Sequence, residues 1–172
     1  HISNLRIVKG TAIYTSNFTP STTPLTAISG TQLLLKYENA AVVDSTKKHN
    51  LVISSSSSTI GSFSPYNKSW SLLFKGTDYI TAAYNAALYL PNDFTIEFFI
   101  NVVSVHSTGE NDFVLTLGEQ WGAGWPSYSI QINHSRQIAL VSSSNNSSIT
   151  LSGTLPTSLT LSKWYHVAFS RS

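Results

Sequence analysis

The chain has 172 residues, of which 41% are apolar and 10% are charged, with ten Lys and Arg against eight Asp and Glu. The apolar content is ample for the core of one domain, whereas a net charge of +2 from scattered basic residues excludes a surface that follows a nucleic-acid backbone. The absence of Cys excludes a disulfide framework and cysteine-ligated zinc, and no apolar run is long enough for membrane insertion.

Short apolar runs bounded by turn residues predict strands at residues 5–8 and 32–37. Residues 14–30 lie between them and hold five Thr and two Pro, a composition typical of an ordered surface loop rather than a helix. Residues 54–58 form a serine run, which predicts a loop or linker. Further along, residues 84–90 are rich in Ala and Leu and are compatible with one turn of helix.

Residues 94–101 carry the strongest periodic signal. Their alternation puts four apolar side chains on one face of a strand and Thr95, Glu97, Phe99 and Asn101 on the other. Similar runs follow at residues 113–117, 128–132, 137–141, 148–151 and 164–169. Turn residues separate these runs at intervals of about ten residues, which is the rhythm of a β-sandwich or barrel.

Three segments in this order resemble successive parts of the laminin-G-like (concanavalin A-like) domains of phage tail and fibre proteins. They are SLLFKGTDYI at residues 71–80, LPNDFTIEFFI at 90–100 and WYHVA at 164–168. The sequence ISNLRIVKGTAIY at residues 2–14 is similar to the closing strand of the same domain type. The resemblance implies an all-β fold, an antiparallel β-sandwich of the concanavalin A-like jelly-roll type, incomplete or permuted at the chain ends.

The same resemblance divides the chain into three parts that we expect to form one compact sandwich. Residues 1–53 resemble closing strands, residues 54–69 are a Ser-rich junction, and residues 70–172 resemble the first part of such a domain. Two alternatives remain open for the head strands: they pair with the tail strands of the same chain, or they complete a neighbour. We favour a fragment of a longer structural protein, in which an edge without a partner would recruit a strand.

Glu97 is the first candidate for chemistry, because related jelly-roll glucanases place two or three acidic residues at alternating positions on one strand. Retaining hydrolysis needs two carboxylates about 5 Å apart, but positions 95 and 99 hold Thr and Phe. We therefore interpret Glu97 as a lone solvated or hydrogen-bonded carboxylate and expect no catalytic residue and no enzyme. The five histidines show no ligand spacing, and we interpret His166 as structural.

The acidic residues concentrate around the predicted strand at residues 113–117. Glu110, Asp112 and Glu119 could supply oxygen ligands to Ca²⁺, which takes six to eight of them. Their spacing matches no rigid calcium loop, and an ordinary polar loop is the alternative. Calcium is accordingly the one cofactor that the sequence suggests.

Trp121, Trp125 and Tyr128 lie in a Gly- and Pro-containing stretch, WGAGWPSY. Flat aromatic faces stack on sugar rings, while neighbouring amides and hydroxyls bond the sugar hydroxyl groups. The alternative is that these rings cap the core or make a subunit contact.

Two functional hypotheses follow. The first is a non-enzymatic virion structural protein, part of a tail, fibre or surface decoration, whose partners are other copies of itself or other virion proteins. The second is an adhesion module that binds a polysaccharide of the host cell surface. Both place the protein on the virion or outside the cell, with no nucleic-acid partner and no membrane insertion.

Overall fold

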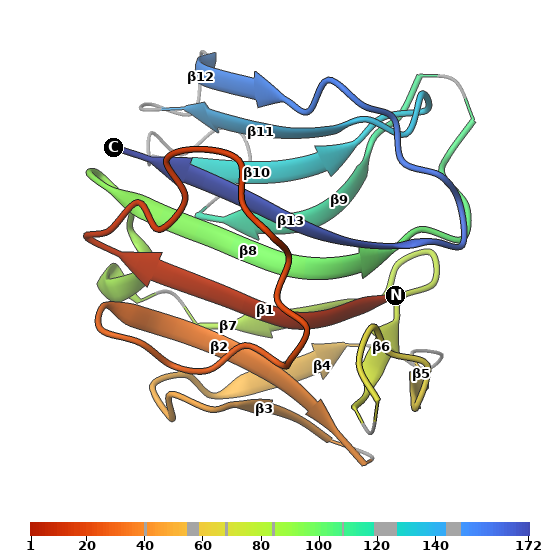
Figure 1. The fold of residues 1–172 in the computed structure, drawn as a ribbon, viewed down its shortest axis with the longest axis horizontal. Coiled ribbons are helices and arrows are strands. Elements are labelled where there is room, and N and C mark those ends of the chain that lie inside the picture. Colours follow the sequence, from red (N-terminus) through yellow and green to blue (C-terminus); the bar gives the residue numbers. More distant parts are fainter. Residues whose placement is uncertain are drawn as a thin grey trace. The chain divides into compact units, whose positions relative to one another are not determined.

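The computed structural model describes residues 1–39, 41–54, 59–67, 69–83, 85–107, 109–118, 127–143 and 149–172. The fold is all-β and its strands pair in antiparallel fashion, as the sequence predicted and as a concanavalin A-like sandwich requires (Figure 1). Within the described residues, contacts separate two compact units: unit 1 comprises residues 1–101 and 164–172, and unit 2 comprises residues 102–163.

Unit 1 is built on a seven-stranded sheet with the order β13-β8-β1-β2-β3, to which β6 and β5 are added beside β1. Its strands are β1 (Ile2–Lys9), β2 (Thr31–Glu38), β3 (Ala41–Asp44), β5 (Thr59–Gly61), β6 (Ser71–Leu73), β8 (Phe94–Asn101) and β13 (Trp164–Arg171). A separate pair joins β4 (Leu51–Ser54) to β7 (Tyr79–Ala82).

The head of the chain lies in the middle of this sheet. Strand β1 pairs with β2 on one side and with β8 on the other, and β8 in turn pairs with β13 without any shift of register. Figure 1 shows β13, β8, β1 and β2 side by side. In this structure β1 is therefore paired on both sides with strands of its own chain.

Unit 2 is an antiparallel meander with the strand order β12-β11-β10-β9. Its strands are β9 (Asp112–Leu117), β10 (Ser127–Ile132), β11 (Ile138–Ser143) and β12 (Ile149–Thr154). Its apolar interior includes Ile130, Ile132 and Ile138, which alternate with more exposed positions in the way that period-two patterning predicts.

Strand β8 differs from the half-exposed strand that its alternation suggested, because all eight of its residues are buried. The apolar face, with Phe94, Ile96 and Phe98 at 0% exposure, belongs to the core. The other face, which carries Glu97 and is called the Glu97 face below, is covered by a segment that we call the strap, residues 10–30. In Figure 1 the strap passes in front of β1, β8 and β13.

A bulge in β1 decides which side chains reach the Glu97 face. Ser3 is paired with Phe99 and Arg6 with Glu97, so three steps along β1 match two steps along β8. The extra residue is accommodated at Asn4, whose φ of 53° lies in the left-handed region that Asn tolerates better than most side chains. The bulge therefore allows Ser3 and Arg6, at odd spacing, to share one face.

Several details differ from the sequence-based expectation. The segment 71–80 is not one strand: a turn at Gly76, with φ of 54°, separates β6 from β7, which pair with different partners. The short strands β3, β4 and β5 had no periodic signal. The helical turn is confirmed as a 3₁₀ turn at Ala86–Leu88. Four residues of the serine run, 55–58, lie outside the described part of the chain.

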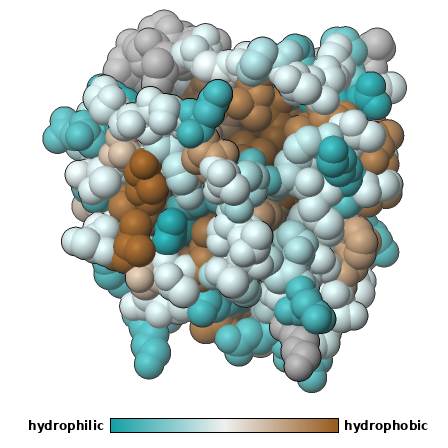
Figure 2. All heavy atoms as spheres, in the orientation of Figure 1, coloured by the Kyte–Doolittle hydropathy of each residue, from teal (hydrophilic) through white to brown (hydrophobic). Residues whose placement is uncertain are grey.

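The face shown in Figure 2 consists largely of residues of intermediate hydropathy, with separate polar and apolar areas between them. This is the appearance expected of a surface rich in Ser and Thr. In the described residues, no helix has the length and apolar character needed to cross a membrane.

Candidate functional site

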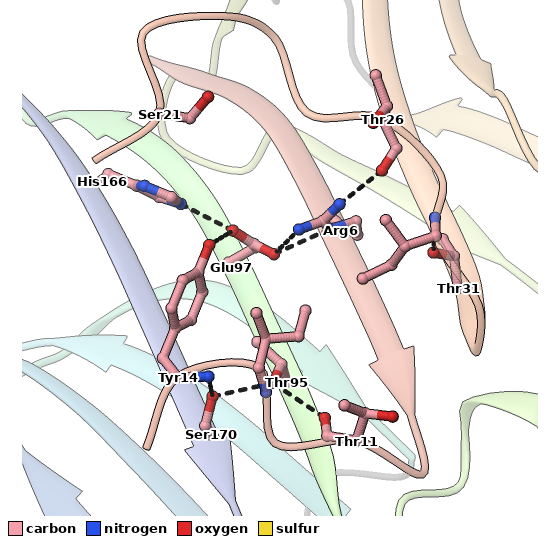
Figure 3. Close-up of polar contacts among 12 residues, drawn as sticks. Arg6, Thr11, Tyr14, Ser21, Thr26, Thr31, Thr95, Glu97, His166 and Ser170 are labelled. Carbon is pink, nitrogen blue, oxygen red and sulfur yellow. Dashed lines mark hydrogen bonds and ion pairs between the residues drawn. The ribbon is translucent and has the colours of Figure 1, made fainter. Parts of the chain in front are cut away.

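The carboxylate of Glu97 is the centre of a buried polar cluster on the sheet of unit 1. Its Oε1 accepts hydrogen bonds from Arg6 Nε at 2.8 Å and from Arg6 Nη2 at 2.5 Å. Its Oε2 accepts from the Tyr14 hydroxyl at 2.8 Å and contacts His166 Nε2 at 2.9 Å. Figure 3 shows these three side chains converging on Glu97 from β1, the strap and β13. We call these four residues the Glu97 cluster.

Three side chains of the cluster are buried. The side chains of Glu97 and His166 are both 0% exposed, and that of Arg6 is 7% exposed. A buried ion pair loses its hydration, so its net stability depends on how fully the remaining polar positions are bonded. Arg6 meets this condition by using Nη1 as well, which donates to the Thr26 carbonyl of the strap at 2.5 Å.

Electrostatics keep Glu97 ionised. Burial alone would raise the pKa of its carboxyl group, but hydrogen bonds from His166, Tyr14 and Arg6, together with the Arg6 charge, hold the pKa below its ordinary value of 4.5. Because an ionised carboxylate can only accept, His166 must carry its hydrogen on Nε2. The Tyr14 hydroxyl feels the opposite effect: burial and the neighbouring Glu97 raise its pKa to about 12.

The strap is also hydrogen-bonded to the sheet at a second point on the Glu97 face. Thr95 Oγ1 accepts from the backbone N–H of Ile13 at 2.8 Å and donates to the Thr11 carbonyl at 3.1 Å. Ser170 accepts from the Tyr14 N–H at 3.3 Å and lies 2.9 Å from Thr95 Oγ1. The polar side chains of β8 and β13 therefore substitute for a neighbouring strand in satisfying the backbone of the strap.

Aromatic rings continue the cluster along the sheet. The His166 ring stacks on Phe99 with centroids 4.2 Å apart and makes a T-shaped contact with Phe18 of the strap at 5.1 Å. Phe99 also meets Tyr66 edge to face at 4.8 Å. Leu25, Leu34, Tyr66 and Phe99 form a buried apolar cluster against which Trp164 packs.

Around Phe99, by contrast, polar atoms remain without partners. Among the described residues, buried side-chain atoms that make no hydrogen bond are Asn4 Oδ1, the Tyr66 hydroxyl, both amide atoms of Asn101, Trp164 Nε1 and His166 Nδ1. Each such group costs about 1–3 kcal/mol. Trp164 and Asn101 are cross-strand partners, and His166 is the partner of Phe99. We call Tyr66, Asn101, Trp164 and His166, with Phe99 between them, the Phe99 cluster.

Two of the predicted calcium ligands, Glu110 and Asp112, contact His106. Asp112 Oδ1 lies 2.5 Å from His106 Nδ1, and its Oδ2 accepts from the His106 N–H at 3.0 Å. This hydrogen bond, with the charges of Asp112 and Glu110, raises the pKa of His106. Glu119 lies outside the described residues, and within them no group of three or more His, Asp or Glu could hold a metal ion. Calcium at this position stays a prediction.

Of the predicted sugar-binding residues, only Tyr128 is described. It lies in β10 and is 6% exposed, so its ring is not accessible for stacking in this structure. Trp121 and Trp125 lie outside the described residues. A sugar site on this stretch would therefore depend on the two tryptophans, and it stays a prediction.

Sequence reasoning found Glu97 and placed His166 in a structural role, but it missed Arg6 and Tyr14. Arg6 looked like an isolated charge in an apolar run, because the bulge at Asn4 has no periodic signal. Tyr14 lies in a segment without regular structure. A buried charge in the middle of an apolar strand was the one available indication, since Arg is almost never buried unless it is paired.

Comparison with known proteins agrees with the fold. The family model described as the concanavalin A-like lectin/glucanases superfamily, of the laminin-G type, matches residues 74–172, a range that includes Glu97, Phe99, Asn101, Trp164 and His166. No curated protein and no solved structure matches the chain significantly. The match spans more than half of the sequence and coincides with an antiparallel all-β fold, and on these grounds the chain belongs to the concanavalin A-like lectin/glucanases superfamily.

Proposed function

We propose that this chain is a non-enzymatic structural module of a virion, in a tail, fibre or surface decoration. The observation that carries the proposal is the state of Glu97, whose two carboxylate oxygens are occupied by Arg6, Tyr14 and His166 at 0% exposure. A general acid or nucleophile must reach its substrate, whereas this carboxylate fastens the strap to the sheet. Among the described residues, the groups that contact this carboxylate are a guanidinium, a hydroxyl and an imidazole, and none is a second carboxylate.

The surface composition supports a role in assembly. Only 10% of residues are charged, so interfaces with other copies or with other virion proteins would form with little desolvation of charge. A site on the virion or otherwise outside the cell fits this composition. The resemblance to phage tail and fibre domains supplies the particular kind of particle.

Two measurements test this proposal. Mass spectrometry of purified virions from the source should find peptides of the chain as a stoichiometric component, and their absence would contradict the virion role. Laminarin and alginate should release no reducing ends when incubated with the protein. Turnover that disappears in Glu97→Gln but persists in Glu38→Gln, a change at an exposed carboxylate, would instead make this chain an enzyme.

Glycan binding is the second candidate, and membership of a superfamily that includes lectins favours it. On this hypothesis the module attaches the particle to a polysaccharide of the host cell surface. Replacing both Trp121 and Trp125 by Ala tests the predicted site: loss of glycan binding with assembly intact supports adhesion through this stretch. Loss of folding or assembly instead supports packing as the role of these residues.

A further inference from the structure

The Phe99 cluster gathers most of the unsatisfied buried polar atoms of the described chain at one place. Five of the six such atoms belong to Tyr66, Asn101, Trp164 and His166. Asn4, which holds the sixth, adjoins Ser3, the β1 residue paired with Phe99. Folded proteins leave few buried polar groups unbonded, and each exception requires an explanation. Their concentration around a single ring points to a function of that ring's surroundings.

The chemistry of these atoms is mixed. Trp164 Nε1 can only donate, Asn101 offers a donor nitrogen and an acceptor oxygen, and the Tyr66 hydroxyl can do both. With Nε2 directed at Glu97, His166 Nδ1 accepts in the neutral ring and donates in the imidazolium. A set of donors alone would suit an anion and a set of acceptors alone would suit a cation. A mixed set suits hydroxyl groups, which donate and accept at once.

The aromatic rings of the Phe99 cluster supply an apolar surface beside these polar atoms. Tyr66 meets Phe99 at 4.8 Å, and Trp164 packs against the same apolar cluster. A sugar ring has an apolar face between its hydroxyl groups, so sites for sugars combine an aromatic platform with a few polar groups at its edge. The Phe99 cluster has both parts within one sheet face.

The cluster is closed in this structure, since its unbonded atoms are inaccessible to solvent. Two parts of the chain contribute to the cover. Leu25 and Phe18 come from the strap, which the Glu97 cluster holds firmly. Residues 62–67, between β5 and β6, contribute Tyr66, and Phe63 of this segment packs against Trp164 with ring centroids 5.4 Å apart.

Residues 62–67 are the weaker part of the cover. Phe63 is 49% exposed. The segment is bonded through the Phe63 carbonyl, which accepts from Ser71 Oγ, and through the Tyr66 N–H, which donates to Ser64 Oγ. The strap, by comparison, is bonded to Arg6, Thr95, Glu97 and Ser170. Displacement of residues 62–67 is therefore the easier way to expose Phe99.

We propose that the Phe99 cluster is a binding site for a hydroxyl-rich ligand of the sugar type, which residues 62–67 close in the free protein. The ligand would bond the atoms of Asn101, Trp164 and His166 that have no partner now, together with the Tyr66 hydroxyl of the segment that closes over it, and this gain offsets the cost of opening. The inference rests on the glycan-binding candidate for the function. It names a different place on the chain from the Trp121 stretch.

Titration of the ¹⁵N-labelled protein with laminarihexaose, maltohexaose and cellohexaose tests the site. The indole N–H signal of Trp164, assigned by its loss in Trp164→Phe, should shift with at least one of these probes. Tyr66→Phe should weaken that binding about fivefold, the equivalent of one hydrogen bond. The same change should leave the melting temperature equal or higher, because the hydroxyl is unbonded in the closed form. Tyr79→Phe, at a residue that is 52% exposed, is the matched control and should change neither quantity.

Other outcomes would distinguish the Phe99 site from glycan binding in general. Binding that ignores Tyr66→Phe but is lost when Trp121 and Trp125 become Ala would retain glycan binding and overturn the Phe99 site. An unmoved Trp164 signal with all three probes would overturn the site as well. A melting temperature lowered by several degrees in Tyr66→Phe would show that the hydroxyl is bonded in the free protein, which also contradicts the proposal.

Discussion

Around Glu97 each buried polar contact is made, whereas around Phe99, two positions further along β8, four side chains keep polar atoms without partners. The two clusters share a sheet face and one residue, His166, whose Nε2 belongs to the first and whose Nδ1 belongs to the second. The comparison separates polar groups that stabilise the fold from polar groups that destabilise it. Substitutions in the two clusters should therefore change the free energy of unfolding in opposite directions.

The largest effect is expected for Glu97→Gln. Removing the charge leaves the guanidinium of Arg6 buried at 6% exposure without a counter-charge, which costs about 3–5 kcal/mol. Urea unfolding at pH 7 measures this loss. Glu38→Gln, at an exposed position of β2, is the matched control and should stay within about 0.5 kcal/mol of the wild type. A loss below about 1 kcal/mol for Glu97→Gln would mean that the pair is solvated and that the strap is not held by it.

Acid should act on the same cluster. The pKa of Glu97 is lower in the folded protein than its ordinary value of 4.5, so its contribution to stability is present above pH 4.5 and is lost as the pH falls below it. Asp44, whose pKa is lowered by hydrogen bonds from Thr46, Leu34 and Lys48 despite the opposing effect of burial, adds to the loss below its ordinary value of 3.8. Free energies of unfolding measured from pH 7 to pH 3 should therefore fall steeply in the wild type.

The variant distinguishes the two carboxylates. Glu97→Gln should show a shallower fall between pH 4.5 and pH 3, because only the Asp44 contribution remains. Parallel curves for the wild type and the variant would contradict the assignment of a lowered pKa to Glu97.

Tyr14→Phe should have a smaller effect. It removes one hydrogen bond to a charged group in a partly exposed position, worth about 1–2 kcal/mol at pH 8. The sign of the pH dependence is opposite to that of Glu97. The pKa of Tyr14 is raised to about 12, so its contribution is present below pH 10 and is lost as the pH rises through 12. The difference in unfolding free energy between wild type and Tyr14→Phe should shrink from pH 8 to pH 12, and a constant difference would contradict the Glu97–Tyr14 bond.

The sequence predicted the regular parts of this molecule better than its clusters, for physical reasons. Alternation placed Thr95, Glu97, Phe99 and Asn101 on one face of β8, and that face is as predicted. The pattern could not show that the face is covered, because the cover is a segment without periodicity. The sequence pattern did not reveal Arg6 and Tyr14, the partners of Glu97. Both are positioned by irregular backbone, Arg6 by the bulge in β1 and Tyr14 by the strap.

The same limit explains why the Phe99 cluster had no sequence signal. Trp164 and His166 are two residues apart on β13, which predicts a shared face, but Tyr66 comes from a connection between two three-residue strands. Only the pairing of β13 with β8 puts Asn101 beside Trp164. Such a cluster is a property of strand order and register, which local propensity does not determine.

The smallest effect, and the one with the opposite sign, is expected for Asn101→Val. Asn101 is 1% exposed, and both of its amide atoms are without a hydrogen-bond partner in the described structure. Valine removes the two polar atoms and suits a strand, so the free energy of unfolding should rise by about 1 kcal/mol. Urea unfolding at pH 7 measures this change, and Glu97→Gln is measured under the same conditions for comparison. A decrease instead would mean that Asn101 is bonded in the free protein, and the distinction between the two clusters would disappear, because both would then stabilise the fold through satisfied polar contacts.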